Sequence, residues 1–208
     1  GAGLFDLSTF TRIEVRGPGA LDLLGSLSCT NLDRPPGRAI YALFLNQHGG
    51  IESDMTIARL APEHFLLFTG AASGPRDLAR LRSAARGRAD VIISDVSPGS
   101  VALGLWGPNA RAIIEPLVAE ARSDLDGPPF SIRSWFVAGI PCMAIRMSYV
   151  GEEGWELHCA TEFGGALWDA LLQAGQAYGL VPAGLHAMDS LRLESGRFAL
   201  GTDLRADR

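Results

Sequence analysis

The chain has 208 residues, of which 47% are hydrophobic and 20% are charged, and its formal net charge at pH 7 is −5. This length suits one domain, or two small lobes that share a core, and the composition is that of a globular protein rather than a disordered one. The modest acidic excess, without a basic run interleaved with aromatic residues, argues against nucleic acid or an anionic membrane as a partner. We therefore expect a small-molecule or protein partner.

The cysteines and the lengths of the apolar runs indicate the cellular compartment of the protein and whether it spans a membrane. The chain has an odd number of cysteines, Cys29, Cys142 and Cys159, which lack C-x-x-C spacing and lie among apolar residues. This pattern predicts reduced core thiols in a cytoplasmic protein. The apolar runs are far shorter than the ~20 residues that a membrane span requires, so no membrane segment is expected. The abrupt start near a strand and the ending "RADR" leave open that the chain is a fragment of a longer protein.

The first predicted elements are a strand, a turn and a helix in "TRIEVRGPGALDLLGSL", residues 11–27. Apolar alternation gives way to helical spacing at Gly17-Pro18, and Pro18 is expected at the first helical position. Downstream, "MTIARLAPEHFLLF" predicts a hairpin that turns at Pro62-Glu63. A second amphipathic helix is indicated after that hairpin, in "GPRDLARL".

The same order of elements returns in the second half of the chain. "SVALGLWGPNARAIIEPL" breaks at Gly107-Pro108, "MAIRMSYVGEEGWEL" turns near Gly151 to Gly154, and a helix pattern follows in "FGGALWDAL". Residues 85–99 join the halves and hold one further strand, Val91 to Ile93. The sequence therefore predicts two copies of a β-rich, two-helix unit, about 1–90 and 91–183.

Hairpins outnumber crossover helices in this pattern, so the predicted fold class is α+β with antiparallel sheets rather than a doubly wound sheet. A final helix is expected over about 184–195, with Leu185, Met188 and Leu191 on one stripe and Gly196 as its stop. Since no Pro/Ser-rich linker separates the copies, we expect them to share one packed body.

The sequence holds no G-x-G-x-x-G after a strand, no G-x-x-x-x-G-K-[ST], no H-E-x-x-H and no G-x-S-x-G. The scattered histidines pair with no cysteine at metal spacing, so no metal site is expected. What remains is a set of polar groups at the ends of glycine-marked strands: Tyr41, Asp54, Tyr149, Glu152 and Glu156.

Asp54 is predicted to share a strand face with Glu52 and Thr56, opposite Met55 and Ile57. Solvent exposure is the default interpretation of Asp54 and of Glu156. Surface-facing hydroxyls are the default for the two tyrosines.

A resemblance changes this interpretation. The segments "GRAIYALFLNQHGGIESDMTI", "RMSYVGEEGWEL" and "MDSLRLESGRFALGTDL" resemble the folate-binding domain of the glycine cleavage T-protein (aminomethyltransferase) family. The motif Y-V-G-E-x-G-W-E, together with F-D-L-S near the start of the chain, is most similar to the branch of this family that forms the C-terminal part of dimethylglycine and sarcosine dehydrogenases. The similarity runs over essentially the whole chain.

The resemblance implies a duplicated α+β fold whose copies enclose a central cavity for tetrahydrofolate. It implies that Asp54 is catalytic and lies beside the folate nitrogens that accept a one-carbon unit, that Glu156 binds the pterin, and that Tyr41 and Tyr149 also line the cofactor site. A carboxylate suits a pterin because it accepts the ring N–H and the exocyclic amine as a bidentate pair. A fixed anion near the reacting carbon stabilises a cationic donor and relays a proton.

Three departures from the T-protein stand out: Ser53 replaces an acid, Met188 replaces an arginine, and the family's C-terminal barrel is missing from this chain. The expected function is one-carbon transfer from an amine donor to tetrahydrofolate, beside a flavoprotein dehydrogenase or oxidase. One alternative is a non-catalytic folate-binding subunit of a sarcosine-oxidase-type complex, and another is an O- or S-demethylating methyltransferase acting on tetrahydrofolate. A related iron–sulfur assembly factor is disfavoured, because its K-G-C-Y-x-G-Q motif corresponds to "RMSYVGEE", which has no cysteine.

Overall fold

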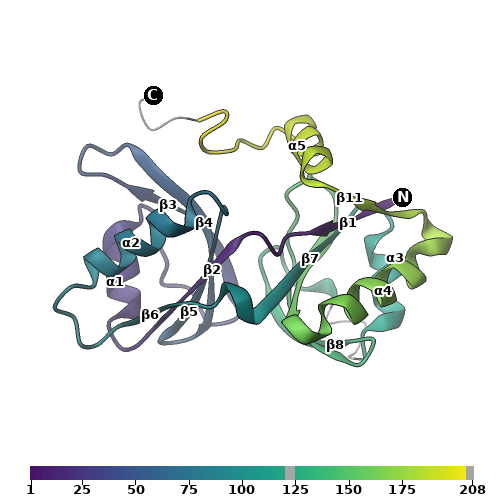
Figure 1. Cartoon of the computed structure of the whole chain (residues 1–208), viewed down its shortest axis with the longest axis horizontal. Helices are drawn as coiled ribbons and strands as arrows, with labels where there is room; N and C mark the ends of the chain where they lie inside the picture. The colour runs from purple at the N-terminus through teal and green to yellow at the C-terminus, as the bar shows by residue number, and fades with distance from the viewer. Residues whose placement is uncertain (120–124, 205–208) are drawn as a thin grey trace. The chain divides into compact units, whose positions relative to one another are not determined.

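The structure is a computed structural model that describes residues 1–119 and 125–204 (Figure 1). The chain divides into two compact units, one of Thr9–Ser97 with residues from Phe198 onward, the other of Gly1–Ser8 with Pro98–Arg197. We call them the five-stranded unit and the six-stranded unit, after their sheets. Among the described strands only β1 (Ala2–Asp6) and β11 (Leu180–Ala183) pair in parallel. The predicted α+β class with antiparallel sheets is confirmed.

The five-stranded unit has the strand order β3-β4-β5-β2-β6. Its strands are β2 (Thr11–Arg16), β3 (Arg38–Leu45), β4 (Ile51–Ala61), β5 (His64–Thr69) and β6 (Ile92–Asp95), and its helices are α1 (Ala20–Leu27) and α2 (Gly74–Ala84). The β4–β5 hairpin turns at Pro62-Glu63, as predicted.

One face of this sheet is covered by α1 and α2. Leu24 of α1 and Leu81 of α2 are fully buried against Phe44, Ile57 and Leu67 of the sheet. Because side chains alternate along a strand, the neighbours of these core residues point to the opposite face. That second face carries Tyr41 and Asp54.

The six-stranded unit has the strand order β11-β1-β7-β10-β9-β8. Its further strands are β7 (Ser100–Trp106), β8 (Ile132–Val137), β9 (Ile140–Ile145) and β10 (Gly154–Ala160). Its helices are α3 (Ala110–Ile114), α4 (Gly164–Gly175) and α5 (Leu185–Glu194). Short 3₁₀ turns lie at Ser97–Gly99, where the chain returns to this unit, and at Glu115–Leu117, Thr161–Phe163 and Gln176–Tyr178. Strand β1 lies between β7 and β11, so the first residues of the chain complete the sheet of the second half.

The core of the six-stranded unit repeats the same plan. Ile113 of α3 and Leu167 of α4 pack against Trp155 and Leu157 of β10. Residues 154, 156 and 158 of β10 therefore point to the face away from α3 and α4. That second face carries Glu156.

Each unit has the same kind of turn before its first helix. Gly17 and Gly107 have φ of 120° and 139°, a region that a residue with a Cβ rarely adopts. Their amides donate to the carbonyls of Glu63 and Glu153, at 2.9 Å in both cases. Each turn thus ties a strand end to the neighbouring hairpin.

Three expectations about local structure need correction. Helix α1 begins at Ala20, so Pro18 lies in the turn and not at the first helical position. The further strand is Ile92–Asp95 rather than Val91 to Ile93. Of the stripe on α5, only Met188 is buried, whereas Leu185 and Leu191 are 47% and 37% exposed.

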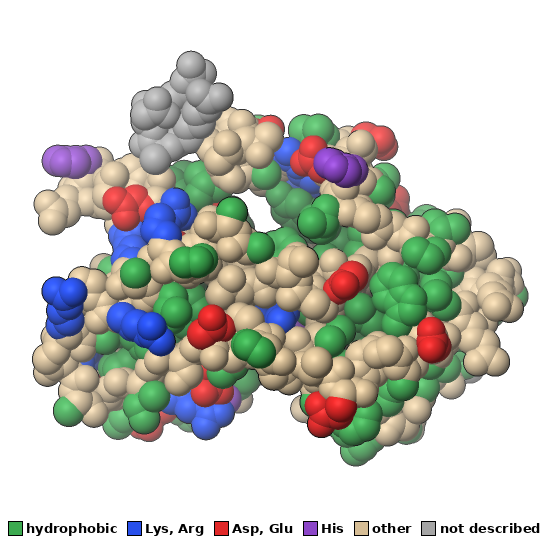
Figure 2. Space-filling model, viewed as in Figure 1, with side chains coloured by type: hydrophobic (Ala, Val, Ile, Leu, Met, Phe, Trp, Pro, Cys, Tyr) green, Lys and Arg blue, Asp and Glu red, His purple; other side chains and the backbone are tan. Residues whose placement is uncertain are grey.

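Arginine side chains gather on the five-stranded unit on the face shown in Figure 2. Four arginines of this unit pair with a nearby acid, as Arg16–Glu14, Arg59–Asp33, Arg80–Glu52 and Arg88–Asp22. Within residues 1–119 and 125–204, no helix is long and apolar enough to cross a membrane, and no group of three or more His, Cys, Asp and Glu side chains could hold a metal ion.

Candidate functional site

Tyr41 and Asp54 are joined by a hydrogen bond on the second face of the five-stranded sheet. The Tyr41 hydroxyl on β3 donates to Asp54 Oδ2 on β4 over 2.9 Å. Leu43 is directly opposite Asp54, and Tyr41 is directly opposite Thr56, so the two bonded side chains are diagonal neighbours on one face. Asp54 is half-buried and Tyr41 is 49% exposed. Two of the predicted site residues are therefore in direct contact.

The two acids of the segment "IESD" have different surroundings. Glu52 is neutralised by Arg80 of α2, with 2.6 Å between Oε2 and Nη1. In the part of the chain that the structure describes, Asp54 has no ion-pair partner, and Tyr41 is the group that holds it. Asp54 is thus the acid of this segment whose charge stays available to a ligand.

A β-bulge explains the difference and corrects one expectation. Phe44 is paired with Ser53, but the next residue of β3, Leu45, is paired with Ile51. Glu52 is therefore an extra residue on β4, and a bulge of this kind re-aims the side chains around it. The prediction that Glu52 shares the face of Asp54 is wrong, because Glu52 turns toward the helix layer.

Glu156 lies on the second face of the six-stranded sheet, opposite a glycine and an isoleucine of the neighbouring strands. It is directly opposite Gly104 of β7 and Ile145 of β9, and its side chain is 14% exposed. The indole of Trp106 lies over Gly104, where an added Cβ would come within 2.9 Å of Trp106 Cζ2. The carboxylate therefore stands beside the buried indole of Trp106, which covers Gly104.

Aromatic residues and a histidine complete the surroundings of Glu156. The rings of Phe5 and Trp106 are 4.9 Å apart, and the Trp106 Nε1–H donates to the Met147 carbonyl at 2.9 Å. His158 Nε2 lies 3.6 Å from Glu156 Oε2 and is 6% exposed. His158 and Trp106 are not apparent as neighbours of Glu156 from the sequence, because alternation along β10 and β7 indicates the face of each side chain but not which side chains meet on it.

Tyr149 and Glu152 lie in the segment that connects β9 to β10. Tyr149 is half-buried, and Glu152 is exposed. Tyr149 and Glu156 therefore belong to the six-stranded unit, whereas Tyr41 and Asp54 belong to the five-stranded unit. The roles predicted for all four residues stay predictions.

Glu153 was not predicted and has the strongest electrostatic contacts in that segment. It accepts hydrogen bonds from Arg111 Nη2 at 2.8 Å and from Arg146 Nη2 at 3.0 Å. The hydrogen bond from Arg111, with a further contribution from Arg146, lowers the pKa of the Glu153 carboxyl below its ordinary value. No local signal reveals this cluster, because Arg111 is far from Glu153 in the sequence.

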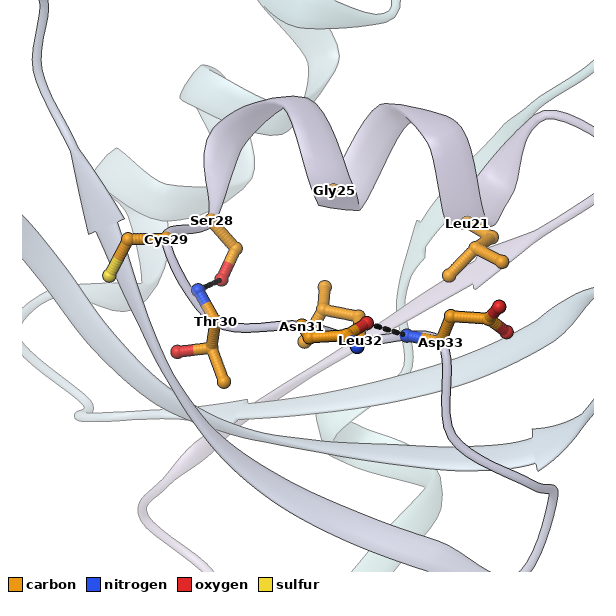
Figure 3. A pocket seen from close by; sticks show the side chains of 8 residues that line it. All are labelled: Leu21, Gly25, Ser28, Cys29, Thr30, Asn31, Leu32 and Asp33. Carbon is orange, nitrogen blue, oxygen red and sulfur yellow. Dashed lines mark hydrogen bonds between the residues drawn. The ribbon is translucent and has the colours of Figure 1, made fainter.

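The pocket in Figure 3 lies elsewhere on the five-stranded unit. It has a volume of about 390 Å³ and is lined by Leu21, Gly25 and residues 28–33. Its polar atoms serve local turns, since Ser28 Oγ and Asn31 Oδ1 accept backbone N–H bonds from Thr30 and Asp33. Cys29 is exposed here, which corrects the expectation that all three thiols are in the core.

A family model described as the GCVT N-terminal domain matches residues 1–208. The chain belongs to the GCVT N-terminal domain family. The resemblance stated from the motifs is therefore confirmed. The chain's relatives include a dimethylglycine dehydrogenase, as the resemblance to that branch leads one to expect.

This GCVT domain is 37% identical over 204 residues to a 4-methylaminobutanoate oxidase (formaldehyde-forming) of Paenarthrobacter nicotinovorans, covering 98% of this chain and 25% of that enzyme. It is 34% identical over 206 residues to the mitochondrial dimethylglycine dehydrogenase of Rattus norvegicus, covering 99% and 24%. The crystal structure of glycine cleavage system aminomethyltransferase T from Bartonella henselae matches with a TM-score of 0.82 and 30% identity, covering 99% of this chain and 54% of that one. The chain thus spans about a quarter of the first two enzymes and about half of the third.

Two departures from the T-protein pattern can now be placed in this GCVT domain. Ser53, which replaces an acid, is 1% exposed and is paired with the core residue Phe44, so it does not share the face of Asp54. Met188, which replaces an arginine, is 8% exposed on α5. Neither residue adds a charge to the second face of either sheet.

Proposed function

We propose that this GCVT domain transfers a one-carbon unit from an amine donor to tetrahydrofolate, with Asp54 at the reacting carbon and Glu156 at the pterin. Family membership supports the reaction class. The observation that carries the residue assignment is the hydrogen bond of Asp54 to Tyr41, on an acid that no cation neutralises among residues 1–119 and 125–204.

Asp54 is suited to act on a cationic donor. An iminium or aminomethyl group carries positive charge, and attack moves positive charge onto the nucleophilic nitrogen, so a fixed carboxylate beside the reacting carbon stabilises charge throughout the transfer. The same carboxylate accepts the proton released at the attacking nitrogen and returns it to the departing amine, so protons balance. Tyr41 fixes the direction of the carboxylate, because its hydroxyl occupies Oδ2 and leaves Oδ1 for the substrate.

Tetrahydrofolate, when bound, supplies the nitrogen nucleophiles that accept the one-carbon unit. The surroundings of Glu156 fit the pterin end of that molecule. The Glu156 carboxylate is bordered by the aromatic packing of Phe5 and Trp106, both of them buried, and the Trp106 indole fills the position that a Cβ on Gly104 would take. Glu156 presents one carboxylate to two adjacent N–H donors, which a bidentate, charge-assisted pair satisfies.

The test is calorimetry with tetrahydrofolate on the wild type, Glu156→Gln and a matched control, Glu152→Gln. Loss of one charge-assisted hydrogen bond corresponds to about 1.5–3 kcal/mol, so Glu156→Gln should weaken binding by roughly ten- to a hundredfold. The exposed Glu152 should tolerate the same change. Equal affinity in all three proteins would contradict the assignment of Glu156.

Asp54→Asn separates catalysis from binding. The variant should keep most of the tetrahydrofolate affinity and lose most of the transfer rate, because the amide keeps the shape of the carboxylate but neither its charge nor its basicity. A parallel loss of affinity and rate would place Asp54 in binding alone.

We further propose that the donor is produced by a flavoprotein dehydrogenase or oxidase joined to, or associated with, this domain. The oxidase and dehydrogenase relatives, of which the chain covers 25% and 24%, support this arrangement. Under the alternative of a non-catalytic subunit, the purified chain binds tetrahydrofolate without transferring a one-carbon unit, even when the flavoprotein is added.

A further inference from the structure

The geometry points to Arg80 as a positioning residue that orients Asp54 by holding the bulge at Glu52. This inference rests on the proposed function for its consequence in catalysis. Its structural part concerns the five-stranded unit alone.

The bulge decides which face Asp54 occupies. With the pairing of Leu45 and Ile51 continued without a bulge, Asp54 would stand opposite Ala42, whose side chain is buried under the helices. A shift of one residue moves each side chain of a strand to the other face. The extra residue at Glu52 therefore puts Asp54 on the face of Tyr41.

Arg80 contacts both strands at this point. Its Nη1 pairs with Glu52 Oε2 on β4, and its Nη2 donates to the Leu45 carbonyl on β3. Its guanidinium carbon lies 5.8 Å from the centre of the Phe44 ring. One planar cation thus joins the bulged residue, the strand opposite it and the core ring beneath it.

The chemistry of arginine explains the arrangement. A bulge interrupts the strand ladder and leaves a carbonyl and a side chain without regular partners. A guanidinium presents donors in a rigid fork, so it can serve a carboxylate and a carbonyl together, whereas a lysine ammonium lacks the planar fork. The Arg80 side chain is 20% exposed, which keeps water from replacing these contacts easily.

Positioning acts on catalysis through Asp54. A displacement of a reacting group by about 1 Å can lower a rate by roughly a hundredfold. Loss of the Arg80 contacts should therefore lower kcat by about tenfold to a hundredfold and leave the KM for tetrahydrofolate nearly unchanged. A residue that merely stabilises the unit would not produce this split.

The experiment is NMR of the ring signals of ¹³C-labelled tyrosine, since the chain has only three tyrosines and Tyr41→Phe assigns the one of interest. Arg80→Ala and Glu52→Ala should both move the Tyr41 signal toward its position in Asp54→Asn. Tyr149 and Tyr178 serve as internal references. Arg82→Ala is the matched control, because Arg82 is exposed on the same helix.

Arg80→Lys and Glu52→Gln are milder changes that keep the inference testable if an alanine variant does not fold. Each should shift the Tyr41 signal in the same direction by a smaller amount. A Tyr41 signal at the wild-type position in folded Arg80→Ala or Arg80→Lys would overturn the inference. If the signal moves as expected but the wild type binds no tetrahydrofolate, the proposed function falls and the structural role of Arg80 stands.

Discussion

Arg111 of α3 and Glu153, the residue before β10, form an ion pair of 2.8 Å that joins a helix of the six-stranded unit to the motif strand. Arg146 adds a second cation at 3.0 Å, and Arg111 Cζ also lies 5.7 Å from the centre of the Trp155 ring. The pair therefore anchors the segment that leads to Glu156.

Acid stability should depend on Glu153. Its pKa is lower in the folded protein than in the unfolded chain, chiefly because Arg111 donates to it. Its contribution is therefore fully present above the unfolded pKa of about 4.3 and is lost as the pH falls through the folded pKa. Glu153→Gln should lower the free energy of unfolding at pH 7 by about 1–3 kcal/mol and flatten its fall below pH 4.3. Urea melts at several pH values measure both effects, and Glu152→Gln should behave as wild type.

Gly104 should not tolerate a side chain. A Cβ there would lie 2.9 Å from Trp106 Cζ2 and 3.1 Å from Leu7 Cδ1, so Gly104→Ala should lower the free energy of unfolding by about 1–3 kcal/mol. Tetrahydrofolate affinity should fall as well, because a displaced Trp106 indole would change the surroundings of Glu156. Gly165→Ala on α4 is the control, since nothing lies within 4 Å of its Cβ position, and it should stabilise the domain by up to about 1 kcal/mol. Thermal melts that rank the two variants in the reverse order would contradict the packing at Gly104.

One thiol should react in the folded protein and three in the unfolded one. Cys29 is exposed, whereas Cys142 and Cys159 are buried. Burial raises the pKa of Cys142 to about 12 and also raises the pKa of Cys159, so both stay protonated and unreactive at neutral pH. Titration with a chromophoric disulfide should give one fast equivalent, which Cys29→Ser removes. Rapid reaction at Cys142 in native buffer would show that this core opens.

Tyr41→Phe should affect the site more than the fold. The hydroxyl is lost from a side chain that is 49% exposed, so the free energy of unfolding should change by no more than about 1 kcal/mol. One-carbon transfer should fall by roughly three- to tenfold, because Asp54 loses the donor that directs it. Tyr178→Phe, which removes a hydroxyl from another exposed tyrosine, is the matched control. Transfer equal to that of the wild type would remove Tyr41 from the proposed site.

The sequence by itself determined the local geometry of this protein. Glycine at 17 and 107 and the dipeptide Pro62-Glu63 predicted turns that the structure contains, because these residue types favour backbone conformations that interrupt a strand. The alternation of residue types along β4 predicted that Asp54 and the buried Met55 lie on opposite faces of the sheet, because successive strand side chains point to opposite faces.

Only the tertiary structure decided which residues meet. The pairing of Glu52 with Arg80, the pairing of Glu153 with Arg111 and the insertion of β1 between β7 and β11 each join segments far apart in the chain. Periodicity encodes the direction of a side chain relative to its own strand. It does not encode the partner, which is set when strand edges pair and charges are buried together during folding.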